Sequence, residues 1–134
     1  MEGQSRLKLL LDTHIWIWFR SAPERLGRRS LEMLKREENE LWLSPISTWE
    51  VLTLQQNGKI DLPADLTAWV EQATAGLKEA LLTHEIALAS RQFLSHQDLS
   101  DRLIAATALV MDLTLVTADE RLLELRNIKT LANR

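Results

Sequence analysis

Four acidic residues stand at positions where a parallel α/β sheet would gather them: Asp12, Glu50, Asp101 and Asp119. Asp12 directly follows the apolar run at residues 7–11, and Asp119 follows a second such run at 113–117. Parallel sheets place their ligand crevice outside the carboxyl ends of the strands, where the strand order reverses. Carboxylates gathered there would repel one another unless a cation lay between them. Because Mg²⁺ and Mn²⁺ prefer oxygen ligands, the four acids predict a metal-dependent enzyme acting on phosphoryl or phosphodiester groups.

The chemistry of such a cluster can be stated in general terms. A bound divalent ion lowers the pKa of water, supplies a hydroxide-like nucleophile and neutralises charge on the scissile phosphate. Two ions about 4 Å apart could stabilise both the attacking and the leaving oxygen. Four carboxylates support that arrangement, and the sequence leaves open whether one ion binds or two.

Each acid also has a purely structural explanation. Asp12 and Asp119 precede predicted helices, where aspartate is a common N-cap. Asp101 falls in the first turn of a predicted helix, where a negative charge complements the helix dipole. Glu50 is harder to explain in this way, because its helix neighbours are largely apolar and no lysine or arginine lies three or four residues away. The four positions taken together are therefore more informative than any one of them.

Several nearby polar residues are secondary candidates. Thr13 and Thr117 flank the strand-end acids and could orient a carboxylate or a water molecule. Asp98 could add an outer carboxylate to the group. His96 could contact a phosphate, although a solvated loop residue is expected there, and His14 is expected to pack within its helix.

The elements that must position these residues alternate along the chain. Strands are predicted at residues 7–11, 41–43, 80–82, 113–117 and 128–131, of which 80–82 is the weakest. Helices are predicted at residues 13–20, 23–37, 45–56, 65–76, 84–94, 100–112 and 120–125. The pair Ser44-Pro45 is typical of a helix start, and Ser100 is the expected N-cap of the helix that carries Asp101. Alternating strands and helices predict an α/β fold with a parallel sheet covered by helices.

Length and composition narrow the class of protein. A chain of 134 residues with 46% hydrophobic content predicts one folded domain covering residues 1–134. The absence of cysteine excludes disulfides, thiolate metal sites and cysteine nucleophiles. No signal pattern and no apolar run of about 20 residues is present, so we expect a cytoplasmic protein with no membrane partner.

The charge distribution is less uniform than the net charge of −3 and the pI of about 5.6 indicate. A basic run could be either a solvated helix face or a surface that contacts phosphates. It consists of Arg20, Arg25, Arg28, Arg29, Lys35 and Arg36. The five tryptophans are expected mainly in the core, although Trp16 and Trp18 cannot both face inward from one helix.

Four motifs carry a resemblance to a known family. They are LLLDTHIW at residues 9–16, SPISTWEV at 44–51, HQDLSDRLIAA at 96–106 and LVTADERL at 115–122. Their order and spacing resemble the PIN-domain ribonucleases, particularly toxins of the VapC type. Each motif is short, but together they span nearly the whole chain. One departure is that the family often has proline after the aspartate matching Asp98, where this chain has Leu99.

The resemblance implies a three-layer α/β/α sandwich around a central parallel sheet of about five short strands. It implies that Asp12, Glu50, Asp101 and Asp119 form a catalytic, metal-binding cluster that requires Mg²⁺ or Mn²⁺. It further implies hydrolysis of RNA to 5′-phosphate and 3′-hydroxyl ends, a homodimer, and a small VapB-like antitoxin as partner. Clustered carboxylates should also destabilise the metal-free fold, so that Asp101→Asn stabilises the protein while abolishing activity.

Parts of the sequence are compatible with two other functions. A catalytically inactive PIN-like module that only binds a partner is disfavoured, because all four acids are retained. An aspartate-nucleophile phosphatase would also place an aspartate after a first strand, as Asp12 is here. Such enzymes usually have a second aspartate two positions later, and this chain has His14 there.

Overall fold

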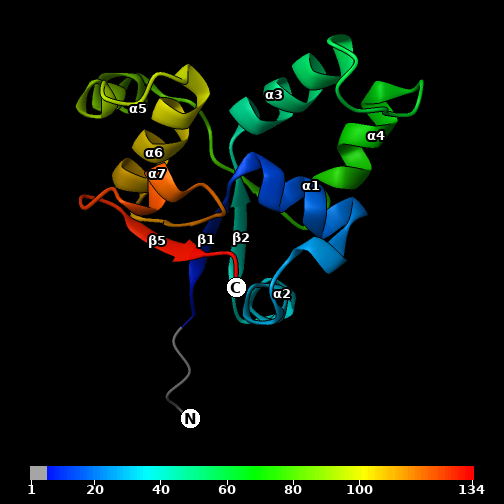
Figure 1. Ribbon diagram of the computed structural model, residues 1–134, viewed down its shortest axis with the longest axis horizontal. Coiled ribbons are helices and arrows are strands. Elements are labelled where there is room, and N and C mark those ends of the chain that lie inside the picture. Colours follow the sequence, from blue (N-terminus) through cyan, green and yellow to red (C-terminus); the bar gives the residue numbers. More distant parts are fainter. Residues whose placement is uncertain (1–5) are drawn as a thin grey trace.

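A five-stranded parallel sheet forms the centre of the computed structural model, which describes residues 6–134 (Figure 1). The strand order is β3-β2-β1-β4-β5, and every adjacent pair is parallel. The strands are β1 (Lys8–Leu11), β2 (Glu40–Leu43), β3 (Lys78–Glu79), β4 (Thr114–Thr117) and β5 (Lys129–Ala132). From β1 the chain adds β2 and β3 on one side and then β4 and β5 on the other. The order therefore reverses between β1 and β4, and the predicted α/β fold is confirmed.

Helices cover both faces of the sheet, with α5, α6 and α7 on one side and α1, α2 and α4 on the other (Figure 1). The helices are α1 (Thr13–Ser21), α2 (Arg28–Lys35), α3 (Pro45–Gln56), α4 (Leu66–Ala73), α5 (His84–Ala89), α6 (Leu99–Met111) and α7 (Glu120–Leu123). Short 3₁₀ turns lie at Pro23–Arg25 and Ser90–Phe93. Within residues 6–134, none of the helices has both the length and the apolar character that crossing a bilayer requires.

The side-chain alternation of β1 divides the interior into two apolar cores. Leu10 packs with the buried residues of α5, α6 and α7, while Leu9 and Leu11 pack with those of α1 and α2. All three leucines are fully buried, as is typical of a central parallel strand with helices on both faces. Burial of each leucine stabilises the fold by about 1.5–3 kcal/mol. This packing holds β1 rigidly, and with it the residues that follow the strand.

Three predicted elements differ markedly in the structure, two of them between α4 and α6. The strand expected at 80–82 is instead β3 at Lys78–Glu79, which pairs with β2 through only two residues. Ala80 still donates a backbone hydrogen bond to Leu43, but Leu81 and Leu82 are exposed and leave the sheet. The helix expected at 84–94 ends at Ala89 and continues as a 3₁₀ turn. A short apolar run in the sequence does not by itself show which of its residues will pair with a neighbouring strand.

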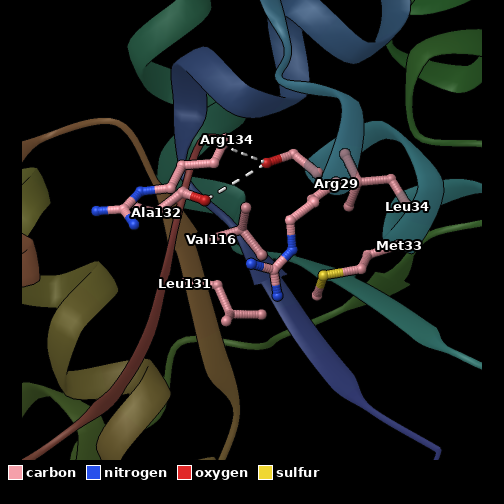
Figure 2. A pocket seen from close by; sticks show the side chains of 8 residues that line it. Arg29, Met33, Leu34, Val116, Leu131, Ala132 and Arg134 are labelled. Atoms are coloured by element: carbon pink, nitrogen blue, oxygen red, sulfur yellow. Dashed lines mark hydrogen bonds between the residues drawn. The ribbon is translucent and has the colours of Figure 1, made fainter.

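The helix expected at 23–37 is divided at Gly27 into a 3₁₀ turn and α2. Gly27 has an ordinary negative φ, so backbone conformation does not explain the glycine. A Cβ atom there would lie 1.7 Å from the carbonyl carbon of Arg134. Ser30 donates its backbone N–H to the Arg134 carbonyl at 2.8 Å, and Ser30 Oγ accepts from the Arg134 backbone N–H at 3.0 Å. The last residues of the chain are thus fastened to the start of α2, beside a hollow of about 80 Å³ between α2 and the strands (Figure 2).

We expect Gly27→Ala to lower the free energy of unfolding by about 1–2 kcal/mol, because the methyl group displaces Arg134 and breaks two hydrogen bonds of about 1 kcal/mol each. Chemical denaturation of both proteins measures the difference. Ser30→Ala disrupts the same contact, so the double variant should lose less than the sum of the two single losses. Strictly additive losses would show that the two substitutions act independently and that Gly27→Ala does not disturb the contact between Ser30 and Arg134.

Candidate functional site: an acidic cleft at the carboxyl ends of β1 and β4

The carboxyl ends of β1 and β4 place Asp12 and Asp119 beside each other at the point where the strand order reverses. Asp12 is the N-cap of α1, and its Oδ1 accepts the Thr13 backbone N–H at 2.9 Å. Its Oδ2 accepts from Thr117 Oγ1 at 2.6 Å. Thr117 Oγ1 also accepts the Asp119 backbone N–H at 3.0 Å, and Asp119 caps α7. The capping explanations for both aspartates are therefore correct, and capping holds each carboxylate toward the same cleft.

Glu50 reaches this cleft from α3 and is held by hydroxyl groups from two other elements. Thr13 Oγ1 donates to Glu50 Oε1, and it also lies 2.8 Å from Ser47 Oγ. Ser100 Oγ lies 2.7 Å from Glu50 Oε2. Glu50 thus has no basic partner in these contacts, and hydroxyl groups compensate its partial burial. The positions of Thr13 and Thr117 agree with their expected role of orienting carboxylates, which remains a prediction.

The first turn of α6 supplies the remaining acids. Asp98, rather than Ser100, is the N-cap, and it accepts the Ser100 backbone N–H at 2.9 Å. The expected N-cap at Ser100 is wrong, because this hydroxyl is turned inward and lies between Asp98 (2.6 Å) and Glu50. Asp101 lies in the first helical turn, as the dipole explanation requires. Asp101 and Asp98 both line the same cleft as Asp12.

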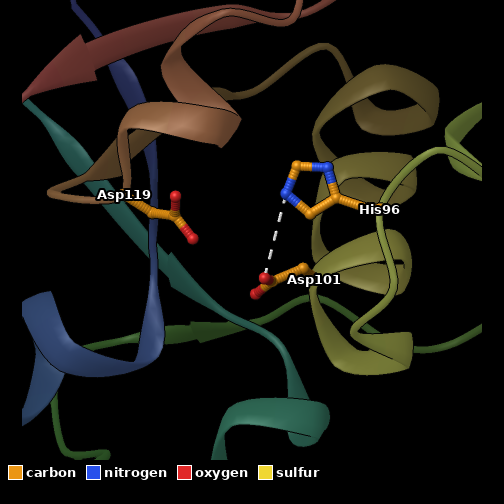
Figure 3. A group of neighbouring side chains, drawn as sticks. All are labelled: His96, Asp101 and Asp119. Atoms are coloured by element: carbon orange, nitrogen blue, oxygen red, sulfur yellow. Dashed lines mark ion pairs between the residues drawn. The ribbon is translucent and has the colours of Figure 1, made fainter.

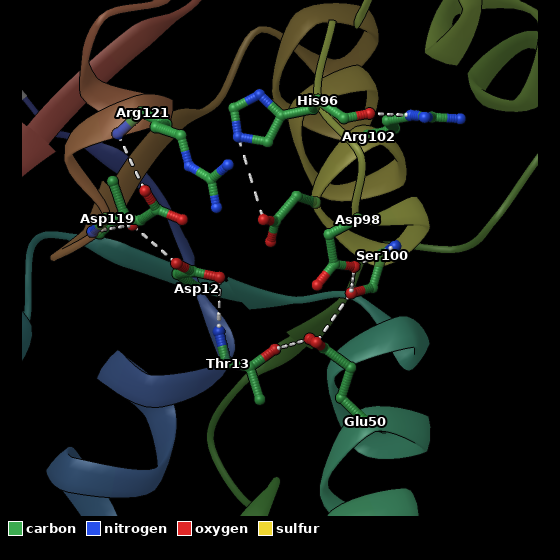
Figure 4. A network of polar contacts seen from close by, with 11 residues as sticks. Asp12, Thr13, Glu50, His96, Asp98, Ser100, Arg102, Asp119 and Arg121 are labelled. Carbon is green, nitrogen blue, oxygen red and sulfur yellow. Dashed lines mark hydrogen bonds and ion pairs between the residues drawn. The ribbon is translucent and has the colours of Figure 1, made fainter. Parts of the chain in front are cut away.

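All four predicted acids therefore line one open cleft, with a volume of about 430 Å³. Figure 4 labels Asp12, Glu50 and Asp119 around it. The lining residues are Asp12, Thr13, His14, Trp18, Glu50, Asp98, Asp101, Ala118, Asp119 and Arg121. His14 is exposed and lines the cleft, and its ring packs within α1 as expected, with its centroid 5.9 Å from that of Trp18. The tryptophans lie mainly in or against the two cores, as expected, and Trp49 is the exposed exception.

Burial and the neighbouring acids raise the pKa of two of the carboxylates. Burial, followed by the charges of Asp98, Asp12, Asp119 and Glu50, raises the pKa of Asp101 to about 7. Burial also raises the pKa of Asp12, against the opposing effect of its hydrogen bonds from Thr117 and Thr13. The Ser100 hydrogen bonds hold the pKa of Asp98 below its ordinary value. The cleft thus favours either a proton or a cation among its carboxylates.

The structure contains a group of side chains that could hold a divalent ion. One ligand atom each from His96, Asp101 and Asp119 lies within 4.8 Å of the other two (Figure 3). Carboxylate oxygens suit a hard divalent cation, and a neutral imidazole nitrogen also binds metals. Asp12 and Glu50 add oxygens to the same cleft. The donor set fits the metal that the carboxylates predict.

The burial of His96 differs from what its place in a polar loop predicts. A solvated side chain was expected, but His96 is buried beside Asp101, and Arg102 of α6 donates to its backbone carbonyl. Ser47 and Ser100, which contact the network around Glu50, were not identified as site residues either. A possible signal is their place in the motifs at residues 44–51 and 96–106, where each lies close to a predicted acid.

Sequence comparison identifies the family. The family model described as PIN domain matches residues 9–128, which is most of the chain. This chain belongs to the PIN domain family. Among curated relatives, the PIN domain is 30% identical over 116 residues to "Ribonuclease VapC22" from Mycobacterium tuberculosis, covering 85% of this chain and 88% of the relative.

Solved structures with the same fold include components of toxin–antitoxin complexes. The PIN domain superimposes on a chain of VapBC2 from Rickettsia felis, bound to a promoter DNA fragment, with a TM-score of 0.71, 19% identity and coverage of 94% of this chain and 98% of that chain. It superimposes on a chain of VapBC-1 from nontypeable Haemophilus influenzae with a TM-score of 0.72, 16% identity and the same two coverages. At these identities the likeness establishes the fold and confirms the predicted PIN-like architecture.

Proposed function

We propose that this PIN domain is a metal-dependent endoribonuclease and the toxin of a type II toxin–antitoxin pair. The observation that carries the proposal is the convergence of Asp12, Glu50, Asp101 and Asp119 on one cleft. The likeness to a curated relative named as a ribonuclease supports RNA as the substrate. We propose these four residues as the catalytic and metal-binding set, with Mg²⁺ or Mn²⁺ as the ion.

Each residue has a role that follows from its contacts. A bound divalent ion would activate water and neutralise charge on the scissile phosphate. Asp101 and Asp119 face the open cleft and are available as ligands. Thr117 and the Thr13 backbone N–H fix the orientation of the Asp12 carboxylate, while Ser100 and the Thr13 hydroxyl fix that of Glu50. Preorganised carboxylates need no reorganisation when substrate arrives.

Basic and aromatic side chains border the acids and support RNA binding. Arg121 and His14 line the cleft, and Figure 4 shows the Arg121 guanidinium extending over it. The Arg25 guanidinium lies 4.8 Å from the centre of the Trp18 ring, and Trp18 also lines the cleft. Positive charge beside an aromatic face is a common platform for single-stranded nucleic acid. Of the basic run, Arg20 is instead structural, because its guanidinium donates to the Ala73 and Ala75 carbonyls.

The proposed partner is a small VapB-like antitoxin, because the structural neighbours come from complexes titled VapBC. An apolar groove of about 430 Å³ is lined by α3, α4 and β3 and contains Trp49, which is 57% exposed. Exposed aromatic residues in such a groove are typical of a protein-binding surface. We also expect the chain to form a homodimer, as its family commonly does, and size-exclusion chromatography with light scattering will measure this.

A cleavage assay tests the proposal. Purified chain is incubated with a panel of transfer, ribosomal and messenger RNAs in Mn²⁺, Mg²⁺ or EDTA, and product ends are mapped. We expect ion-dependent cleavage with 5′-phosphate and 3′-hydroxyl ends, which Asp12→Asn abolishes. The nuclease proposal would be overturned if the wild-type protein cleaved none of these RNAs and behaved like Asp12→Asn. Calorimetric titration with Mn²⁺ distinguishes the nuclease from an inactive partner-binding module. The nuclease should bind Mn²⁺ at a site that Glu50→Gln removes, whereas the inactive module should show no such site.

A further inference from the structure

His96 is a buried imidazole with one nitrogen that lacks a partner. Its side chain is 6% exposed, and Nε2 has no hydrogen-bond partner among the residues that the structure describes. An unsatisfied polar atom in the interior is destabilising, because it loses its hydrogen bonds to water and gains none in the protein. Buried groups of this kind are rare in folded proteins and call for an explanation such as an ion or a catalytic role.

The backbone around His96 holds this nitrogen toward the acids. The His96 N–H donates to the Phe93 carbonyl at 3.0 Å, and its own carbonyl accepts from Arg102 Nε. Figure 3 shows the ring directed at Asp101 and Asp119, which lie across the cleft from each other. The Nε2 atom is 3.9 Å from Asp101 Oδ2, which is too long for a hydrogen bond. The loop therefore orients the ring without giving Nε2 a bond.

That separation is compatible with two ligands of one ion. Two atoms each about 2.1 Å from a common cation lie no more than about 4.2 Å apart. The ligand atoms of His96, Asp101 and Asp119 lie within 4.8 Å of one another. We propose that these three side chains close around a transition-metal ion such as Mn²⁺ to form a mixed nitrogen–oxygen site. This inference rests on the proposed metal-dependent function and adds to it a ligand, His96, and a preference among ions.

The other two acids of the cleft are better satisfied by the protein. Both Asp12 oxygens accept hydrogen bonds, from the Thr13 N–H and from Thr117. Both Glu50 oxygens contact hydroxyl groups, of Thr13 and Ser100. The His96 end of the cleft thus carries the unpartnered nitrogen, next to the carboxylate of Asp101. An ion bound there would satisfy both groups at once.

A nitrogen ligand changes which ion the cleft prefers. Mg²⁺ favours oxygen ligands and retains several waters, whereas imidazole suits transition metals. The site should therefore bind Mn²⁺ more tightly than Mg²⁺, and Co²⁺ and Ni²⁺ more tightly still, following the order of intrinsic affinities. Loss of the imidazole should compress this series, because the remaining ligands would all be oxygens.

Pulsed electron paramagnetic resonance of Mn²⁺ tests the assignment directly. The full chain is labelled with ¹⁵N-histidine and loaded with one equivalent of Mn²⁺. We expect a ¹⁵N coupling in the wild-type protein that His96→Gln removes and His14→Gln retains. His14→Gln is a matched control, because this exposed histidine lines the same cleft. An absent ¹⁵N coupling in wild type, or one lost with His14, overturns the proposal even if His96→Gln does not fold.

Equilibrium titrations give a second readout. His96→Gln should weaken Mn²⁺ binding by about 10- to 100-fold, a range typical of losing a group that supports a metal site. Mg²⁺ binding should change by less than about 3-fold, since its preferred ligands remain. Equal losses for both ions would contradict a nitrogen ligand. RNA cleavage is measured separately. A ¹⁵N coupling without cleavage would reject the ribonuclease activity but not the metal site, and Mn²⁺-dependent cleavage without the coupling would reject His96 as a ligand but not the activity.

Discussion

Asp101→Asn should lower the rate of Mn²⁺-dependent RNA cleavage by on the order of 10³-fold. The side chain keeps its shape but loses the negative charge that attracts the ion. Electrostatic stabilisation by a metal contributes several kcal/mol to such reactions, and about 4 kcal/mol corresponds to this factor. Single-turnover cleavage of the best substrate from the RNA panel measures the effect.

The same helix supplies a matched control in Asp112→Asn. Asp112 ends α6 with a positive φ of 55°, a conformation that asparagine also adopts readily. Its carboxylate is exposed and pairs with Lys129 at 2.9 Å, away from the cleft. We expect this variant to cleave RNA within about 2-fold of wild type, since exposed ion pairs contribute little. Similar losses in the two variants would mean that Asp101 acts through the helix and not through the cleft.

Metal-free protein should lose stability as the pH rises from about 4 to about 7. Asp101 has a pKa of about 7 in the folded protein, above its ordinary value of 3.8. Between these values the folded state binds more protons than the unfolded state, so each rise in pH favours unfolding. The raised pKa of Asp12 acts in the same direction. Above about pH 7 the contribution of Asp101 is fully lost and the curve should flatten.

The causes are burial of the Asp101 carboxylate and repulsion from the neighbouring acids, so removing its charge should reverse the effect. At pH 8 we expect metal-free Asp101→Asn to be about 2 kcal/mol more stable than wild type, below the full linkage value because the cleft is open to water. That corresponds to a rise in Tm of roughly 5–8 °C. Mn²⁺ at 100 times its Kd should add about 2.7 kcal/mol to the wild type and much less to the variant.

Differential scanning calorimetry between pH 4 and 8, with and without Mn²⁺, measures these differences. Asp112→Asn should keep the wild-type pH profile. A metal-free Asp101→Asn that melts below wild type at pH 8 would show that the carboxylates do not repel one another as their proximity implies. The two predictions for Asp101 have opposite signs, because activity and metal-free stability make opposite demands on the same charge.

Much of the site follows from local patterns that survive folding. An acid directly after an apolar strand must lie at the carboxyl edge of a parallel sheet, which is where Asp12 and Asp119 are found. Glu50 was predicted from its lack of a basic partner along the helix, and its carboxylate indeed contacts hydroxyl groups. The placement of these residues is predictable because strand ends and helix faces are determined by residues within a few positions of one another.

The sequence by itself thus determined the α/β class, the elements that carry the four acids, and their likeness to one family. Only the tertiary structure decided that His96 is buried with a free nitrogen, that Ser100 turns toward Glu50, and that Gly27 must make room for Arg134. Each of these depends on contacts between segments that are distant in sequence or on the path of a loop. Periodicity and capping report only on near neighbours, so the environment of a loop side chain emerges when those segments pack together.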